Sequence, residues 1–557
     1  MSLFRKKSID KIVADAEAGL GDGHASGLKK VLGVKDLTFM GIAAVIGAGI
    51  FSTIGTAAYN GGPGIATLFI ITAITCGFCA LCYAEFASRV PIAGSAYTYA
   101  YVSFGELIAW IIGWALILEY AIGNIVVAIS WSGYFDNLLQ GLGVHLPSWL
   151  LKDPFTASSL VEEANKAMAA KQPLTDSMKE ALEAWSQAPI IFGKHFFINL
   201  PAFIIVCLIA ALAYVGIQES KKSTNFMVAF KILVIIFVII LGGFYVQPTN
   251  WSPFMPNGFT GVLAGVSAVF YAYIGFDAIS TTAEECKNPQ KDLPRGMIYS
   301  LIICTVLYVL IALVLTGMVS YKELKVDDPL AYVFEKINLK WAGYIISVSA
   351  VVATTSVLLV FQLGQPRIWM SMSRDGLLPK AFGTVHPKFR TPAFATIVSG
   401  GFVAIAALFM PSSLMTDLTS IGTLFAFVLV CLGVLALPKI KSESGKFKLP
   451  YINGKFLLPI TTIAFIYFSR HRITDAIANI GSESYQEILF LVFLLLTIVL
   501  AIRSFIRSSS AIPVFGALCC LYLMIEIPAV SWMWFFVWMG VGLTVYFLYG
   551  RNKSKLA

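Results

Sequence analysis

Apolar segments of about 20 residues alternate with short polar stretches along almost the whole chain. A helix of that length crosses a hydrocarbon core of about 30 Å, whereas a β-barrel would show shorter, alternating segments. The pattern therefore predicts an all-α polytopic membrane protein. We expect helices at 36–58, 64–88, 104–138, 197–217, 223–245, 259–283, 296–320, 341–372, 393–410, 416–438, 455–469, 485–506, 511–527 and 531–549. The segment 455–469 is short and 470–484 is ambiguous, so twelve spans is the alternative to fourteen.

Composition and charge support this interpretation. The chain is 58% hydrophobic and 13% charged, against about 25% charged in soluble domains. Its net charge of +9 does not indicate nucleic-acid binding, because Lys and Arg lie between the apolar runs. With a cytoplasmic N-terminus, the inner segments carry 27 Lys and Arg and the short outer loops carry 6. The positive-inside rule thus predicts an inner or plasma membrane protein with both termini in the cytoplasm.

Two segments give weaker signals. Residues 1–35 are polar and basic without an apolar core, so we expect no cleaved signal peptide. Residues 139–196 contain an amphipathic sequence that predicts two short helices on the outer surface, as a small cap or a docking surface. Cys76, Cys79 and Cys82 share a helix face, and we expect them to pack as small apolar side chains rather than to bind a metal.

The first and sixth expected helices share an irregularity. The first contains "VIGAGIF", with Gly47 and Gly49 at its midpoint, and the sixth contains "FYAYIGFDAIST", with Gly275 and Asp277 at the matching depth. Each begins a set of five helices, and an odd number of spans per set inverts the second copy. Paired interruptions of this kind indicate the central site of a transporter built from inverted repeats. Close helix packing through small residues is the alternative reading of the glycines.

Three ionisable residues fall inside apolar runs: Glu119, Lys231 and Asp277. Each costs about 2.5–3.5 kcal/mol on insertion scales, so we expect them to face one interior cavity and to compensate one another or a ligand. A structural ion pair or snorkelling near a helix end is the alternative. Asp277 could also cap a half-helix, because Asp is a favoured N-cap residue.

The breaks also expose backbone groups that suit a zwitterion. The N-terminal end of a half-helix presents N–H donors and a positive dipole to a carboxylate, while unwound carbonyls suit an ammonium group. Two facing breaks therefore match the head group of an amino acid.

The chain resembles the cationic amino acid transporter family of the amino acid–polyamine–organocation superfamily. The resemblance is carried by "VIGAGIFSTIGTAA", "YAEFASRVPIAGSAYTYAYVSFGELIAWIIGWALILEYAIG", "FYAYIGFDAISTTAEECKNPQKDLPRGM", "GQPRIWMSMSRDGLLP" and "CLYLMIEIP" with "VYFLYG". It implies a five-plus-five inverted-repeat core with broken helices 1 and 6, followed by extra C-terminal helices. It also implies transport of L-amino acids, cationic or small and neutral, coupled to protons in members of bacterial type.

The resemblance assigns roles to particular residues. The substrate carboxylate is expected at the backbone N–H groups of Gly47, Ala48 and Gly49, and the ammonium at the carbonyls of Val45, Tyr271, Ala272 and Ile274. Glu119 and Asp277 are expected at the substrate and in proton coupling, and Lys231 in proton coupling. Phe361 is expected on the helix 8 side of the pocket, where its ring would limit side-chain size.

The expected organisation has four parts. They are a cytoplasmic segment 1–35, a first repeat 36–245 with the outer insertion 139–196, a second repeat 246–438, and accessory helices with a short tail at 439–557. The main hypothesis is a proton-coupled importer working by alternating access. An uncoupled exchanger and a non-transporting amino acid sensor are the alternatives. We expect no enzyme activity, no cofactor beyond the proton gradient, no nucleic acid and no obligate protein partner besides substrate and lipid bilayer.

Overall fold

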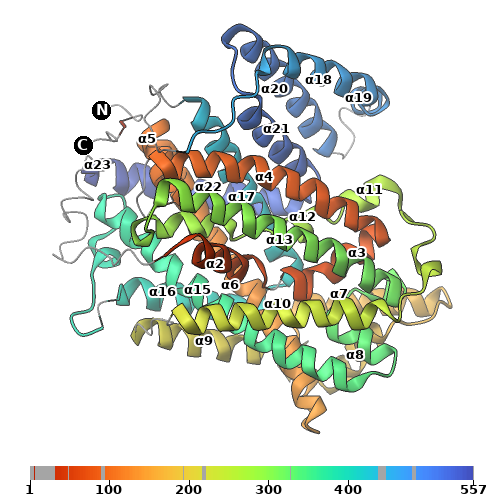
Figure 1. Ribbon diagram of the computed structural model, residues 1–557. Helices are drawn as coiled ribbons and strands as arrows, with labels where there is room; N and C mark the ends of the chain where they lie inside the picture. The colour runs from red at the N-terminus through yellow and green to blue at the C-terminus, as the bar shows by residue number, and fades with distance from the viewer. Residues whose placement is uncertain are drawn as a thin grey trace.

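The computed structural model describes most of the chain as a bundle of helices (Figure 1). The described residues are 5–6, 32–47, 49–89, 95–191, 193–215, 221–326, 328–389, 391–436, 447–478 and 485–555. Within them, the expectation of an all-α membrane protein is confirmed, apart from one hairpin of two strands with two residues each.

Seven helical stretches of the described chain are long and apolar enough to cross a membrane. They are Gly49–Arg89 (η1, α3, η2 and α4), Glu106–Gly141 (α6), Pro289–Met318 (α13), Lys340–Arg374 (α15), Ser412–Ala436 (α17), Tyr485–Arg507 (α20) and Ala529–Lys553 (α22, η8 and α23). Shorter apolar stretches lie between them: Leu200–Val215 (α9), Met227–Gly243 within the helix Lys221–Gly243 (α10), Val266–Ser280, Ala393–Phe409 (α16), Gly454–Phe468 (α18) and Ala511–Ile525 (α21).

Burial separates the central helices from the lipid-facing ones. α6 is apolar on all sides, and 89% of its most apolar window is buried, as expected for a helix surrounded by others. It packs against α15 and α17. The same windows of α20 and α22 are only 28% and 22% buried, so their apolar side chains face the bilayer. α18, α19 and α20 lie together at one edge of the bundle (Figure 1).

Two interrupted segments correspond to the expected irregular helices. Val34–Val45 (α2) is followed by a π-helical turn at Gly49–Thr53 (η1) and by Ile54–Gly61 (α3). Gly258–Leu263 (α11) and Val266–Tyr271 (α12) are followed by a 3₁₀ segment at Phe276–Glu285 (η5). The ambiguous stretch after residue 469 contains a separate short helix, Arg470–Ala478 (α19).

The insertion at 139–196 forms the two expected helices, Pro154–Ala169 (α7) and Asp176–Gln187 (α8). Asp153 caps α7 by accepting hydrogen bonds from the backbone N–H groups of Phe155 and Thr156, and this satisfies donors that a helix start leaves unpaired. An antiparallel hairpin of Ile190–Ile191 (β1) and Lys194–His195 (β2) follows.

Smaller helices complete the connections. They are Gly62–Gly64 (η2), Ser95–Ser103 (α5), Ser148–Leu150 (η3), Pro248–Trp251 (η4), Tyr321–Glu323 (η6), Pro329–Lys336 (α14), Lys380–Gly383 (η7), Tyr546–Gly550 (η8) and Arg551–Lys553 (α23).

The cysteine string packs in the interior. Cys76, Cys79 and Cys82 are fully buried on α4, and the Cys79 Sγ lies 3.4 Å from the Cys520 Sγ of α21. In the described part of the chain, no group of His, Cys, Asp and Glu side chains is arranged to hold a metal ion.

Candidate functional site

The first break lies at the glycines that the sequence singled out. α2 ends at Val45, and Ile46 adopts an extended conformation with φ −78° and ψ 91°. The Gly47 carbonyl then accepts from the backbone N–H groups of Ile50 and Phe51, at 3.2 and 3.3 Å. Ala48, predicted to contact the substrate carboxylate, lies outside the described residues. The helix is therefore interrupted where main-chain groups were expected to contact substrate.

The second break lies between α12 and η5. The turn at 272–275 contains Gly275 with φ +115°, a conformation that side chains with a Cβ rarely adopt. A Cβ on Gly275 would also lie 2.9 Å from the carbonyl carbon and oxygen of Ala44. Glycine is thus required here both by the backbone torsion and by the contact with α2.

The two breaks touch each other directly. A Cβ on Gly49 would lie 2.3 Å from the Cα of Ala272, well inside ordinary van der Waals distance. The glycine therefore lets the backbone of η1 approach the turn that interrupts the sixth helix. Both readings of Gly49, as a packing residue and as part of a break, apply to the same position.

Lys231 extends from α10 to the first break. Its side chain is 1% exposed, and its Nζ donates to the Ser356 Oγ of α15 at 2.8 Å and to the Ile46 carbonyl at 3.5 Å. A single ammonium group thus connects three segments: α10, α15 and the unwound stretch after α2. An unwound carbonyl together with a hydroxyl is the kind of oxygen set that otherwise holds a small cation.

Tyrosine and threonine hydroxyls fix the backbone around the first break. The Tyr308 hydroxyl of α13 donates to the Val45 carbonyl at 2.9 Å, and the Tyr134 hydroxyl of α6 donates to the Phe51 carbonyl. The Thr53 Oγ1 is 2.9 Å from both the Gly49 carbonyl and the Ala268 carbonyl of α12. Because Val45 already accepts one hydrogen bond, a substrate ammonium would have to share that carbonyl with Tyr308.

The two buried carboxyl groups have different surroundings. Asp277 is 3% exposed and lies in the first turn of η5, where the helix dipole favours a carboxylate. Its capping role stays a prediction. Glu119 of α6 is 5% exposed and lies beside Thr423 of α17.

Phe361 of α15 forms an apolar wall with α6. Its ring meets Tyr120 edge-on, with centroids 5.6 Å apart, and its Cε2 would lie 3.2 Å from a Cβ on Gly123. The Tyr271 hydroxyl donates to the Gly123 carbonyl at 3.0 Å, so predicted residues of α12 and α15 meet at one point of α6. Ala272 and Ile274 lie buried in and beside the turn after α12.

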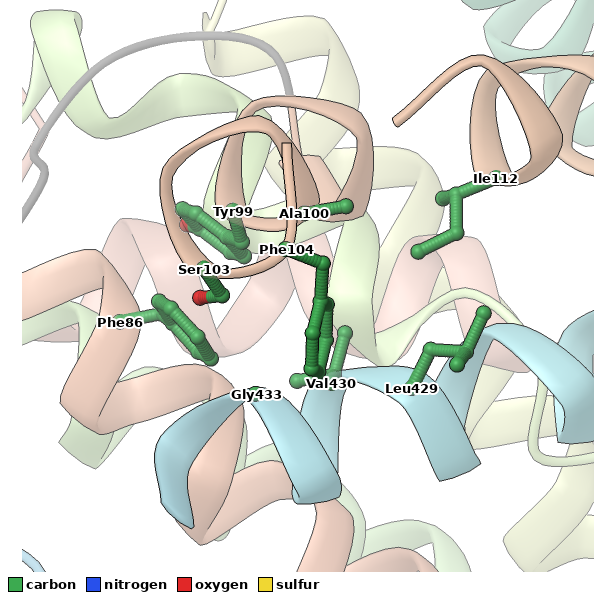
Figure 2. A pocket seen from close by; sticks show the side chains of 9 residues that line it. All are labelled: Phe86, Tyr99, Ala100, Ser103, Phe104, Ile112, Leu429, Val430 and Gly433. Atoms are coloured by element: carbon green, nitrogen blue, oxygen red, sulfur yellow. The ribbon is translucent and has the colours of Figure 1, made fainter. Parts of the chain in front are cut away.

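Aromatic rings lie on one side of the second break. The Phe276 ring, next to Asp277, contacts Tyr83 of α4 and Phe427 of α17 with centroids 6.3 and 5.3 Å apart. Beyond them, side chains of α4, α5, α6 and α17 pack so closely that no room for a water molecule remains (Figure 2). The rings cover the second break on this side.

Sequence reasoning identified the interrupted helices and the buried charges, but it missed the hydroxyl groups that hold them. Ser356, Tyr308 and Thr53 lie in apolar helices, and only the packing of α10, α12, α13 and α15 around the first break shows what they contact. A polar side chain within an apolar run was the available signal. It is weak for hydroxyls, which can bond to the backbone of their own helix.

Comparison with known proteins agrees with this geometry. The sequence pattern of the amino acid permease family matches residues 32–470, and that of the family's C-terminal region matches residues 511–554. The chain is 39% identical to a branched-chain amino acid permease and 37% identical to a methylthioribose transporter, both from Bacillus subtilis; each match covers 100% of this chain and 99% of the relative.

A third relative matches a shorter part of this chain. A vacuolar cationic amino acid transporter from Arabidopsis thaliana is 37% identical over 78% of this chain and 63% of its own length. The recognition made from the broken helices is confirmed: the chain belongs to the amino acid permease family, with cationic amino acid transporters among its relatives, and is a membrane transporter rather than an enzyme.

Proposed function

We propose that the chain imports L-amino acids, cationic or small and neutral, by proton-coupled alternating access. The observation that carries the proposal is Lys231, whose Nζ bonds Ser356 and the Ile46 carbonyl at the first break. A fixed ammonium there replaces a bound metal cation, and a buried lysine can release its proton. Loss of the proton would remove the positive charge and weaken the hydrogen bonds to Ile46 and Ser356, which the neutral amine could still donate, and so would loosen the attachment of α10 to α15 and to the first break.

The burial of the carboxyl groups supports a second protonation site, because Glu119 and Asp277 are 5% and 3% exposed within the bundle. We assign Glu119 and Asp277 to proton coupling together with Lys231, and Asp277 would report to the substrate through the amides that it would cap.

The substrate head group is proposed to bind at the two breaks. Backbone N–H groups of Gly47, Ala48 and Gly49 would take the carboxylate, and carbonyls of Val45, Tyr271, Ala272 and Ile274 would take the ammonium. The side chain would point towards Phe361 and Glu119. A branched-chain permease and cationic transporters among the relatives support an amino acid as substrate but differ in the side chain.

The proposed topology follows from the apolar pattern and the charge distribution of the sequence. We place fourteen spans in a five-plus-five core, with 36–245 and 246–438 as inverted repeats, 439–557 as accessory helices, and both termini in the cytoplasm. The protein would lie in a plasma or inner membrane.

Proteoliposomes test the transport proposal. Uptake of labelled leucine, alanine and arginine is measured with an imposed pH gradient or sodium gradient, and methylthioribose is added as a competitor. We expect accumulation driven by the pH gradient. Uptake that follows sodium, or counterflow without net accumulation, would contradict proton coupling.

Substitution of the lysine tests the assigned group. Lys231→Met should abolish accumulation driven by the pH gradient, because the variant cannot change its charge. Lys340→Met, at the exposed start of α15, is the matched control and should retain it. Full accumulation by Lys231→Met would exclude Lys231 as the coupling group.

A further inference from the structure

Helix α5 connects the inner ends of α4 and α6, and its two faces have different partners. One face carries Tyr99, which stacks on Phe86 with centroids 4.8 Å apart and meets Tyr83 edge-on at 6.1 Å. Tyr83 in turn contacts Phe276 and Phe427. This face of α5 therefore belongs to the aromatic layer that covers the second break.

The other face carries two tyrosines that bind carboxylates. The Tyr97 hydroxyl donates to the Asp375 Oδ2 at the end of α15 at 2.6 Å, and the Tyr101 hydroxyl donates to the Glu106 Oε2 at the start of α6 at 3.0 Å. Burial and the neighbouring carboxylates raise the pKa of both tyrosines, so both remain protonated donors. α5 is thus attached to two of the central helices at their inner ends.

Both ends of the described chain meet α5's carboxylate partners. Glu106 is fully buried and also accepts from Arg5 Nη2 at 3.2 Å, Tyr546 Oη at 3.0 Å and Ser554 Oγ at 2.6 Å. The Lys555 N–H donates to the Asp375 carbonyl at 3.0 Å. The N-terminal part therefore meets Glu106, and the C-terminal part meets both Glu106 and Asp375, the two residues that hold α5.

The side chains around α5 are closely packed against α17. Phe86, Tyr99, Ser103 and Phe104 face residues of α17 with no room for a water molecule between them (Figure 2). Because protein interiors are close-packed, α5 can swing away from α17 only if Tyr99 and Phe86 separate from it.

We propose that α5 is the inner gate of the transporter, and that the C-terminal tail holds it closed through Glu106 and Asp375. Outward movement of Tyr99 removes support from Tyr83 and Phe276 and opens the path from the breaks to the cytoplasm. The tail therefore disfavours the inward-open state, because it holds α5 in the closed position. The gating role depends on the proposed alternating access, whereas the clamp on α5 can be measured without any substrate.

Hydrogen exchange in the full-length protein tests the clamp. Tyr546→Phe and Ser554→Ala remove hydroxyl donors from Glu106 while the Tyr546 ring remains. Tyr549→Phe, three residues along, has no hydrogen bond to Glu106 in the described structure and is the matched control. Deuterium uptake is followed in peptides covering 95–103 and 276–285, and melting temperatures show that each variant is folded.

We expect the double variant to exchange at least about 10-fold faster in both peptides, since the loss of one hydrogen bond to a carboxylate already shifts an opening equilibrium by about that factor. The control should exchange as the unmodified protein does. Unchanged exchange at 95–103 would overturn the clamp, and faster exchange at 95–103 with none at 276–285 would overturn the gate. Failure of amino acid uptake would refute the proposed function. The exchange rates would still show whether the tail holds α5.

Discussion

Gly49→Ala tests the contact between the two breaks. The added Cβ would lie 2.3 Å from the Ala272 Cα, whereas ordinary contact begins at 3.4 Å, so the backbones must separate by about 1.1 Å. The obstructing atom is backbone and cannot rotate away. Overpacking of this kind costs about 1–3 kcal/mol, which corresponds to about 5- to 150-fold in an equilibrium constant. If substrate binds the state in which the breaks touch, its Kd should rise by that factor.

The assay is amino acid binding and uptake by purified protein, together with its melting temperature in detergent. Gly401→Ala, in α16, is the matched control because a Cβ there meets nothing within 4 Å. It should leave binding unchanged and stabilise α16 slightly, since alanine is the better helix former. Normal Kd and uptake by Gly49→Ala would show that the breaks need not touch, and would refute this view of the site.

Three further substitutions test individual residues. Tyr308→Phe should weaken binding about fivefold, because the unwound Val45 carbonyl loses a hydrogen bond worth about 1 kcal/mol that holds it in position for the ammonium. Tyr299→Phe, exposed on the same helix, is its control. Equal Kd values, or tighter binding to a carbonyl that is no longer shared, would contradict this positioning role. Phe361→Leu should let larger side chains such as arginine compete in uptake, and an unchanged competition profile would exclude Phe361 as the wall. Asp277→Asn should keep the cap and its melting temperature, whereas Asp277→Ala should lose about 1 kcal/mol of stability; equal melting curves would contradict the cap.

The buried charges show how far sequence reasoning reached. Glu119, Lys231 and Asp277 were singled out because each is costly in an apolar run, and all three are buried. Their partners were not foreseen. Lys231 bonds Ser356, 125 residues away in sequence, so this charge connects separate helices, whereas Asp277 lies in the first turn of its own helix, η5.

The sequence by itself determined the class of protein, the irregular first and sixth helices and the buried ionisable groups. These features depend on local composition: apolar length specifies a spanning helix, and glycine marks a backbone that cannot remain regular. Tertiary structure decided that Gly49 lies against Ala272, that the Tyr308 hydroxyl donates to the Val45 carbonyl, and that Arg5 and Ser554 both bond Glu106. Such contacts join residues tens to hundreds of positions apart, and they arise only when ridges and grooves of separate helices pack together.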